Sequence, residues 1–318
     1  MKRLLAAALA VLACGAALAQ GYPSRPIRFV VPFSAGSGTD IIARAVGETM
    51  SRNLHQPVII DNRPGAGGTI AAGQVARGDA DGYTVLIASS GHALNPSIYP
   101  NLPYDTLRDL TGITPLAAMP NVLVVSPARG WKSVADLVAA AKAKPGQLNY
   151  ASAGVGSATH LNAEKFKLQA GLDAVHVPFK GTPEAMSDVI GGRNDWFFAP
   201  LSSALPLVRD GKLQALAVST PTRASVLPGV PTTVEAGVPG SDYIFWVAMI
   251  VPGATPQPVM QRLHDEALKA LADPEVKDRL AKLGAEPFPL EQNAFNAFIR
   301  TEVESASRIA KAANLRGQ

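Results

Sequence analysis

The sequence offers almost nothing for covalent cross-linking. Its 318 residues include one cysteine, Cys14. A lone cysteine forms no internal disulfide, and Cys14 precedes the cleavage site predicted below. Disulfide frameworks and thiol nucleophiles are therefore excluded for the mature chain.

Charge is also sparse. Lys, Arg, Asp and Glu make up 17% of the residues, and the formal net charge is +4. Without Lys2 and Arg3, 27 basic residues face 25 acidic ones, and the basic residues form no cluster. A nucleic-acid interface needs a concentrated basic surface, so we expect no nucleic-acid partner.

Long apolar runs are missing after the N-terminus, which instead has the three parts of a secretory signal. Lys2-Arg3 is followed by an apolar segment at 4–13 and by the small-residue site Ala17-Leu18-Ala19. We expect cleavage near Ala19 and export to the periplasm. Residues 11–14 weakly resemble a lipobox, which leaves lipidation of Cys14 as an alternative.

The chain is longer than one hydrophobic core usually supports, which favours two lobes. Strand-like and helix-like segments alternate, as in α/β folds with crossover helices. We predict a two-lobed α/β architecture in which each lobe is a mostly parallel sheet flanked by helices. The predicted division is a signal peptide at 1–19, a first lobe of 20–121 and 243–318, and a second lobe of 122–242.

Two glycine- and serine-rich loops follow predicted strands and open predicted helices. The first lies between a strand at 27–31 and a helix that begins near Asp40, and the second lies between a strand at 148–152 and a helix at 161–170. Glycine lets backbone N–H groups approach a ligand, and a helix N-terminus favours an anion. The pair predicts a carboxylate held between two lobes. Ordinary strand-to-helix turns are the alternative interpretation.

The chain resembles the extracytoplasmic substrate-binding proteins of tripartite tricarboxylate transporters, the Bug family, over essentially all of its mature length. Eight short blocks carry the resemblance: Pro32-Phe33…Gly36…Asp40, Asn62-Arg63-Pro64-Gly65-Ala66-Gly67-Gly68, Asp81-Gly82-Tyr83-Thr84, Tyr150-Ala151-Ser152…Gly154…Gly156-Ser157…His160-Leu161, Val177-Pro178-Phe179-Lys180-Gly181, Gly211-Lys212-Leu213, Val230-Pro231-Thr232…Glu235-Ala236-Gly237 and Pro252-Gly253-Ala254-Thr255-Pro256. Each block is weak alone, and their order behind a signal peptide is specific.

The resemblance implies a type II-like periplasmic binding protein that holds a small organic acid between its lobes and delivers it to integral membrane transporter subunits. It implies a monomer with no cofactor, no metal site and no catalytic residue. Ser37, where a second glycine is common, and Asn194, where an apolar residue is usual, depart from the family pattern and leave the identity of the ligand open. The predicted ligand-binding residues are Phe33, Ala35, Ser37, Gly38, Thr39, Asp40, Ser89, Ser152, Gly154, Gly156, Ser157, His160, Asp195 and Ser202.

Several of these residues have a structural alternative. Asp40 fits a ligand ammonium group, but it equally fits the dipole of its own helix. His160 is placed either to contact the ligand or to cap and pack, and Asp195 either orients a polar ligand group or pairs with Arg193. Phe245 is either a wall of the pocket or part of the core.

Three other functions fit parts of the sequence. A nucleotide-dependent oxidoreductase would use the first glycine loop with Asp61, but Ile41 stands where the third glycine of the fingerprint belongs. A hydrolase would use Ser157 and His160, but no Gly-x-Ser-x-Gly elbow surrounds Ser157. A periplasmic ligand sensor would have the same fold, but it would signal through a membrane partner instead of delivering the ligand for transport.

Overall fold

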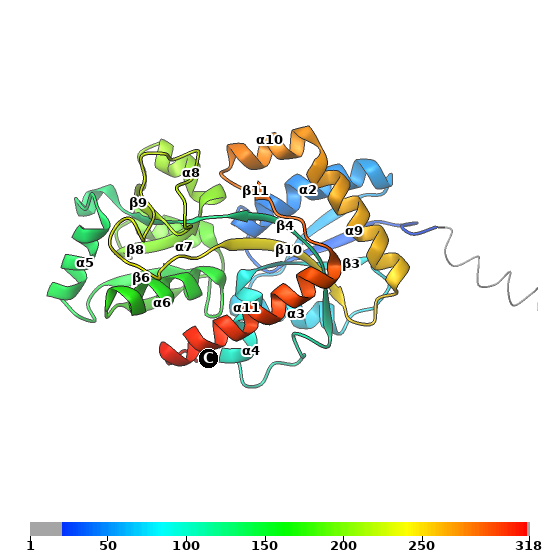
Figure 1. The fold of residues 1–318 in the computed structure, drawn as a ribbon, viewed down its shortest axis with the longest axis horizontal. Helices are drawn as coiled ribbons and strands as arrows, with labels where there is room; N and C mark the ends of the chain where they lie inside the picture. The colour runs from blue at the N-terminus through cyan, green and yellow to red at the C-terminus, as the bar shows by residue number, and fades with distance from the viewer. Residues whose placement is uncertain (1–20, 317–318) are drawn as a thin grey trace, which may run out of the picture.

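The computed structural model describes residues 21–316, which form two sheets with helices on both sides (Figure 1). The predicted signal peptide, its cleavage site and Cys14 lie outside the described residues. Within residues 21–316, no helix combines the length and apolarity that crossing a bilayer requires.

The first lobe is built on a six-stranded sheet of order β11-β4-β10-β3-β1-β2. Its strands are β1 (Ile27–Val31), β2 (Val58–Asn62), β3 (Thr84–Ser89), β4 (Leu110–Met119), β10 (Phe245–Pro252) and β11 (Glu286–Pro287). Its helices are α2 (Gly38–Leu54), η1 (Ala66–Gly68), α3 (Thr69–Ala76), η2 (Ser90–Ala93), α4 (Asn95–Ile98), α9 (Gln257–Ala272), α10 (Pro274–Lys282) and α11 (Gln292–Ala312).

The second lobe is built on a five-stranded sheet of order β7-β6-β8-β5-β9. Its strands are β5 (Asn121–Val125), β6 (Asn149–Ser152), β7 (Val175–Pro178), β8 (Trp196–Pro200) and β9 (Gln214–Val218). Its helices are η3 (Pro127–Arg129), α5 (Val134–Ala143), α6 (Ala158–Ala170), α7 (Thr182–Ile190) and α8 (Leu201–Arg209).

The two-lobed α/β class is confirmed, but the sheets are mixed rather than mostly parallel. The strands joined by crossover helices are parallel, as in the β1–β2, β1–β3, β6–β7 and β6–β8 pairs. β10 and β5 are the first strands after each passage between the lobes, and both run antiparallel to their neighbours. A strand that enters from the other lobe needs no crossover helix, so nothing forces it to be parallel.

The longest elements that the sequence did not predict are β4 and α8. β4 contains Gly112 and Pro115, which normally argue against a strand, and both lie beside register irregularities in its pairing with β10. A Cβ at Gly112 would lie 2.6 Å from the Phe295 ring, so glycine lets α11 pack on this strand. α8 contains Pro206, a residue that normally argues against a helix interior.

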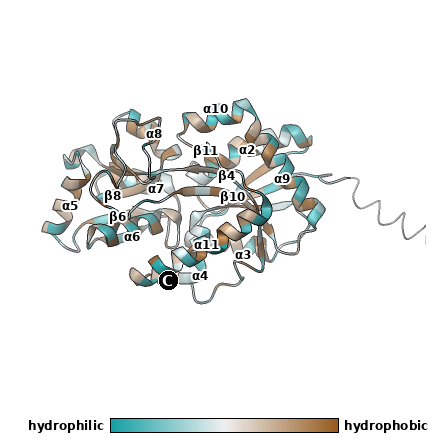
Figure 2. Cartoon of the chain, in the orientation of Figure 1, coloured by the Kyte–Doolittle hydropathy of each residue, from teal (hydrophilic) through white to brown (hydrophobic). Residues whose placement is uncertain are grey.

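Alternating side chains of the central strands bury both faces of each sheet. In β1, Phe29 and Val31 pack toward α2 and α9, whereas Val30 packs toward α3. In β8, Phe197 and Phe198 likewise enter separate clusters on opposite faces. Figure 2 shows the same layering, with hydrophobic central strands and polar residues on the outer faces of the helices.

The two connections between the lobes are hydrogen-bonded to each other. The chain passes from β4 to β5 and returns between β9 and β10. Ser219 Oγ accepts from the Asn121 N–H at 3.0 Å and donates to the Tyr243 carbonyl oxygen at 2.7 Å. This shared contact fixes the crossing segments beside each other and positions the two lobes face to face.

Candidate ligand-binding site

The first glycine loop, residues 34–40, is here called the first lip. Ser37 is the N-cap of α2, with φ −69° and ψ 157°, and its Oγ accepts from the Asp40 N–H at 3.5 Å. The Ser37 N–H donates to the Ser34 carbonyl oxygen, which makes a tight turn with Gly36 at φ +83°. Only glycine adopts that φ without strain, so the loop can present its N–H groups at the helix start.

The second glycine loop, residues 154–160, is here called the second lip, and it repeats this geometry. Ser157 is the N-cap of α6, with φ −70° and ψ 160°, and its Oγ accepts from the His160 N–H at 3.3 Å. The Ser157 N–H donates to the Gly154 carbonyl oxygen, and Gly156 has φ +84°. Each lobe thus offers a helix N-terminus with the same cap and turn.

The two lips meet at one cavity, here called the lip cavity. Its remaining space is about 10 Å³, room for about one water molecule. Six predicted ligand-binding residues line it: Phe33, Ser37, Gly38, Thr39, Ser89 and Ser157. Phe245, considered as a pocket wall, lines it too, together with five residues that were not predicted: Ala153, Ala158, Thr159, Thr182 and Pro200. Both helix dipoles therefore point their positive ends into the same small space.

Two hydroxyl groups beside the lip cavity are buried without a hydrogen-bond partner. They are Thr39 Oγ1 on the first lobe and Ser202 Oγ on the second. A buried hydroxyl that bonds nothing costs free energy, so each would gain from a hydrogen bond to a group that enters the cavity. Together with the N–H groups of the lips, they form a set of donors suited to a carboxylate, with one hydroxyl from each lobe.

Asp40 supports the first lip rather than facing the cavity. Its carboxylate accepts from the Gly36 N–H at 2.9 Å, from Arg44 Nε at 2.9 Å and from Asn62 Nδ2 at 2.9 Å. Burial raises the pKa of Asp40, but these hydrogen bonds and the Arg44 charge outweigh burial and hold the pKa below its usual value. The structural alternative for Asp40 is the one that the geometry favours.

His160 takes the equivalent place in the second lip. Its Nδ1 accepts from the Gly156 N–H at 3.3 Å, and its ring stacks on His176 with centroids 4.0 Å apart. His176 Nε2 lies 2.6 Å from Ser152 Oγ, which accepts from the Gly154 N–H at 3.0 Å. Both histidines therefore fix the backbone of the lip from behind.

Burial keeps these two histidines neutral. It lowers the pKa of His160 to about 4, and the Lys167 charge acts in the same direction. Burial also lowers the pKa of His176 to about 3, helped by the neighbouring His160. A neutral His160 can accept the Gly156 N–H, whereas an imidazolium could not.

Ala35, on the rim of the first lip, is exposed. Gly154 and Gly156 belong to the second lip, and Ser152 ends β6 just before it. Asp195 is not a cleft residue, which corrects the prediction. It accepts from the Asn149 N–H and pairs with Arg129 at 2.6 Å, at the end of β8 opposite to the lip cavity. The sequence located a strand but did not say which of its ends faces the cleft.

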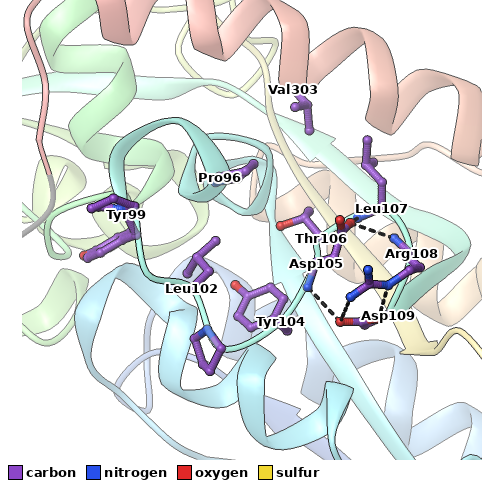
Figure 3. Close-up of a pocket in the computed structure, with 12 residues that line it drawn as sticks. Pro96, Tyr99, Leu102, Tyr104, Asp105, Thr106, Leu107, Arg108, Asp109 and Val303 are labelled. Atoms are coloured by element: carbon purple, nitrogen blue, oxygen red, sulfur yellow. Dashed lines mark hydrogen bonds and ion pairs between the residues drawn. The ribbon is translucent and has the colours of Figure 1, made fainter.

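The described residues contain no group of histidine, cysteine or acidic side chains arranged for a metal ion. A separate groove of about 530 Å³ lies at the surface, between residues 96–109 and Val303 of α11 (Figure 3). It shares no lining residue with the lip cavity.

Comparisons with known proteins agree with this arrangement. The family model described as "Tripartite tricarboxylate transporter family receptor" matches residues 42–315. BugT of Bordetella pertussis is 35% identical over 90% of this chain and 88% of its own. A solved R. palustris protein with adipate is 34% identical with a TM-score of 0.90, covering 93% of this chain and 99% of its own. MatC from Rhodopseudomonas palustris, solved with bound malate, is 31% identical with a TM-score of 0.86, covering 90% of this chain and 99% of its own.

The fold and the paired lips define a two-lobed solute-binding protein. The chain belongs to the tripartite tricarboxylate transporter receptor family.

Proposed function

We propose that this protein captures a small organic acid by its carboxylate between two lobes, 20–121 with 243–318 and 122–242, and delivers it to integral membrane transporter subunits. One observation carries the proposal. Two helix N-termini with the same cap and turn, one from each lobe, line a single cavity. That arrangement favours one shared anion.

The chemistry of the site supports binding rather than catalysis. Ser157 Oγ accepts from the His160 N–H and lies 3.0 Å from Thr159 Oγ1, whereas the His160 ring accepts from Gly156. His160 is thus occupied with the loop and does not act as a base toward Ser157. The adipate and malate of the two solved relatives are carboxylates, which supports the same ligand class.

Two hydrogen bonds join the lobes directly across the lip cavity. Ser203 Oγ donates to the Gly36 carbonyl oxygen at 3.1 Å, and Ser34 Oγ donates to Glu184 at 2.6 Å. Each bond joins the first lip to the second lobe. A ligand that touches both lips adds to these contacts and shifts the population toward the closed form.

The closed form would be the one that docks on the membrane subunits. We propose that the protein works as a monomer in the periplasm, because the ligand site is complete within one chain. Discrimination between open and closed forms would let the transporter respond to loaded protein.

A thermal-shift panel tests the ligand class. The mature protein would be heated with mono-, di- and tricarboxylates, amino acids, neutral sugars and nucleotides. A carboxylate that binds raises the melting temperature by mass action, by an amount that grows with its concentration. A panel in which only sugars or nucleotides raise it would overturn the proposal.

A further inference from the structure

Two glycines of the first lobe lie directly against the main chain of the second lip. A Cβ at Gly67, on η1, would lie 2.0 Å from the Val155 carbonyl oxygen. A Cβ at Gly91, on η2, would lie 2.5 Å from the Ala158 nitrogen and 2.8 Å from the Gly156 carbonyl oxygen. Both distances to the nearest atom are shorter than real Cβ contacts, so a side chain at either position would push the second lip away from the first lobe.

Backbone conformation alone does not explain why these two positions hold glycine. Gly91 lies outside the left-handed region, so alanine could adopt its φ. Gly67 has φ +58° and ψ 17°, a conformation that asparagine and aspartate also adopt. What both positions exclude is a Cβ that faces the second lip. Close approach between the lobes is therefore the property that glycine provides here.

Tyr99 holds the same segment from the first lobe by a hydrogen bond. This residue follows α4 (Figure 3), and its hydroxyl donates to the Val155 carbonyl oxygen at 2.8 Å. The same peptide unit carries the Gly156 N–H, which donates to His160 Nδ1 at 3.3 Å. The peptide that leads into the Ser157 cap is thus held on one side by the first lobe and on the other by its own helix.

We infer that Gly67, Gly91 and Tyr99, here called the latch, close on the second lip from the first lobe and position its N–H groups for the ligand carboxylate. None of the three lines the lip cavity, so they are positioning residues. The inference rests on the proposed function, since it assumes a carboxylate at the lips. When the lobes open, the second lip leaves the latch and loses the Tyr99 hydrogen bond. Ligand affinity therefore depends on contacts that the ligand itself does not make.

Alanine substitutions test the latch by calorimetry on the mature protein with acetate, succinate, malate, adipate and citrate. Gly67→Ala should weaken binding at least about 100-fold, because its Cβ would overlap the main chain of the second lip and hold the lobes apart. Gly130→Ala is the control, because Gly130 also has a left-handed φ, +73°, but a Cβ there would meet nothing within 4 Å. Gly91→Ala should reproduce the loss, which keeps the test open if Gly67→Ala does not fold.

Two further measurements separate a latch from a permanent part of the fold. In small-angle X-ray scattering, a bound carboxylate should reduce the radius of gyration of the natural chain and of Gly130→Ala, but not of Gly67→Ala. Without ligand, Gly67→Ala and Gly130→Ala should melt at the same temperature, because the latch is then open. A much lower melting temperature for unliganded Gly67→Ala would make this contact part of the fold and overturn the inference.

Tyr99→Phe removes only the hydroxyl and keeps the ring. It should weaken binding by about fivefold, the loss of one hydrogen bond, and the change should appear in the dissociation rate because the ligand arrives before the lobes close. Tyr83→Phe is the control, since the Tyr83 hydroxyl accepts the Ser24 N–H within the first lobe.

The outcomes separate the two proposals. If the natural chain binds none of the five carboxylates, the proposed function fails. If it binds one of them, and Gly67→Ala and Gly91→Ala bind it as tightly as Gly130→Ala does, the proposed function stands and only the latch fails.

Discussion

The two lips have the same backbone but differ in the side chain that supports it. In each, a serine caps a helix, a glycine with φ near +84° precedes that serine, and the side chain three residues after the serine accepts the glycine N–H. That side chain is Asp40 in the first lip and His160 in the second. One lip therefore carries a negative charge beneath the anion site, and the other carries none.

The difference shows how the site limits repulsion of its ligand. Asp40 is offset by Arg44 and Asn62, whose hydrogen bonds turn its carboxylate away from the lip cavity. A second acid at position 160 would have Lys167 within its surroundings, but that lysine is already paired with Glu164 at 2.8 Å. A neutral His160 supplies the same acceptor without adding charge.

The first prediction, which has the largest expected effect, is that the two lips lose stability at different pH values. The folded pKa of His160, about 4, lies below that of an unfolded histidine, about 6.5, so the unfolded state takes up the proton first. His160 alone should lower the free energy of unfolding by about 3 kcal/mol as the pH falls from 6.5 to 4, and the buried His92 and His176, whose pKa values are also lowered, add to this fall. Asp40, whose pKa is lowered, holds its contribution until the pH falls below that of an unfolded aspartate, about 3.9. The second lip should thus weaken in acid before the first.

Urea unfolding between pH 7 and 4 checks this order. His160→Gln should remove about one third of the pH dependence in that window, because His92 and His176 remain and their pKa values are lowered by a similar amount or more. His55→Gln removes an exposed histidine and should leave the profile as it is in the natural chain. Equal slopes for His160→Gln and His55→Gln would show that the second lip is not the acid-sensitive part.

The second prediction tests whether the lips must approach each other. A Cβ at Gly38 would lie 2.6 Å from Pro200 Cβ, which belongs to the second lobe. Gly38→Ala should therefore leave α2 intact and weaken carboxylate binding by about 10- to 100-fold, the cost of 1–3 kcal/mol typical of overpacking. Gly229→Ala, where a Cβ would meet nothing within 4 Å, is the control. Unchanged affinity for Gly38→Ala in calorimetry would mean that binding does not need this closed contact.

The third prediction concerns a substitution that gives the second lip the same supporting residue as the first. His160→Asp would place a second carboxylate at a helix start beside the ligand, without an equivalent of Arg44. Repulsion between two like charges at this range should weaken binding by about tenfold or more. His160→Asn supplies a neutral acceptor and should lose far less. The loss should also shrink at high salt, and equal losses in the two variants would assign the effect to geometry instead of charge.

The sequence predicted each lip because both are local. The strand, the glycine turn and the serine cap are contiguous, and the chemistry of Gly36–Ser37 and Gly156–Ser157 carries the signal. The residues that close the cavity, such as Pro200 and Thr182, come from other elements and have no local signature. The same limit explains the error at Asp195, because the direction of β8 toward the cleft is set by its partners in the sheet.

The fourth and smallest prediction asks whether the two lobes hold the same anion equally. Thr39 Oγ1 and Ser202 Oγ are the two buried hydroxyls beside the lip cavity that have no hydrogen-bond partner among the described residues, one from each lobe. Removing either one, by Thr39→Val or Ser202→Ala, should weaken carboxylate binding by about fivefold, the loss of about 1 kcal/mol from one hydrogen bond.

In the absence of ligand, the same changes should leave the free energy of unfolding unchanged or raise it slightly, because each removes a buried polar group that bonds nothing. Opposite effects on affinity and stability identify a hydroxyl kept for the ligand. A loss of stability without a loss of affinity, at either position, would assign that hydroxyl to the fold and leave the carboxylate to the other lobe.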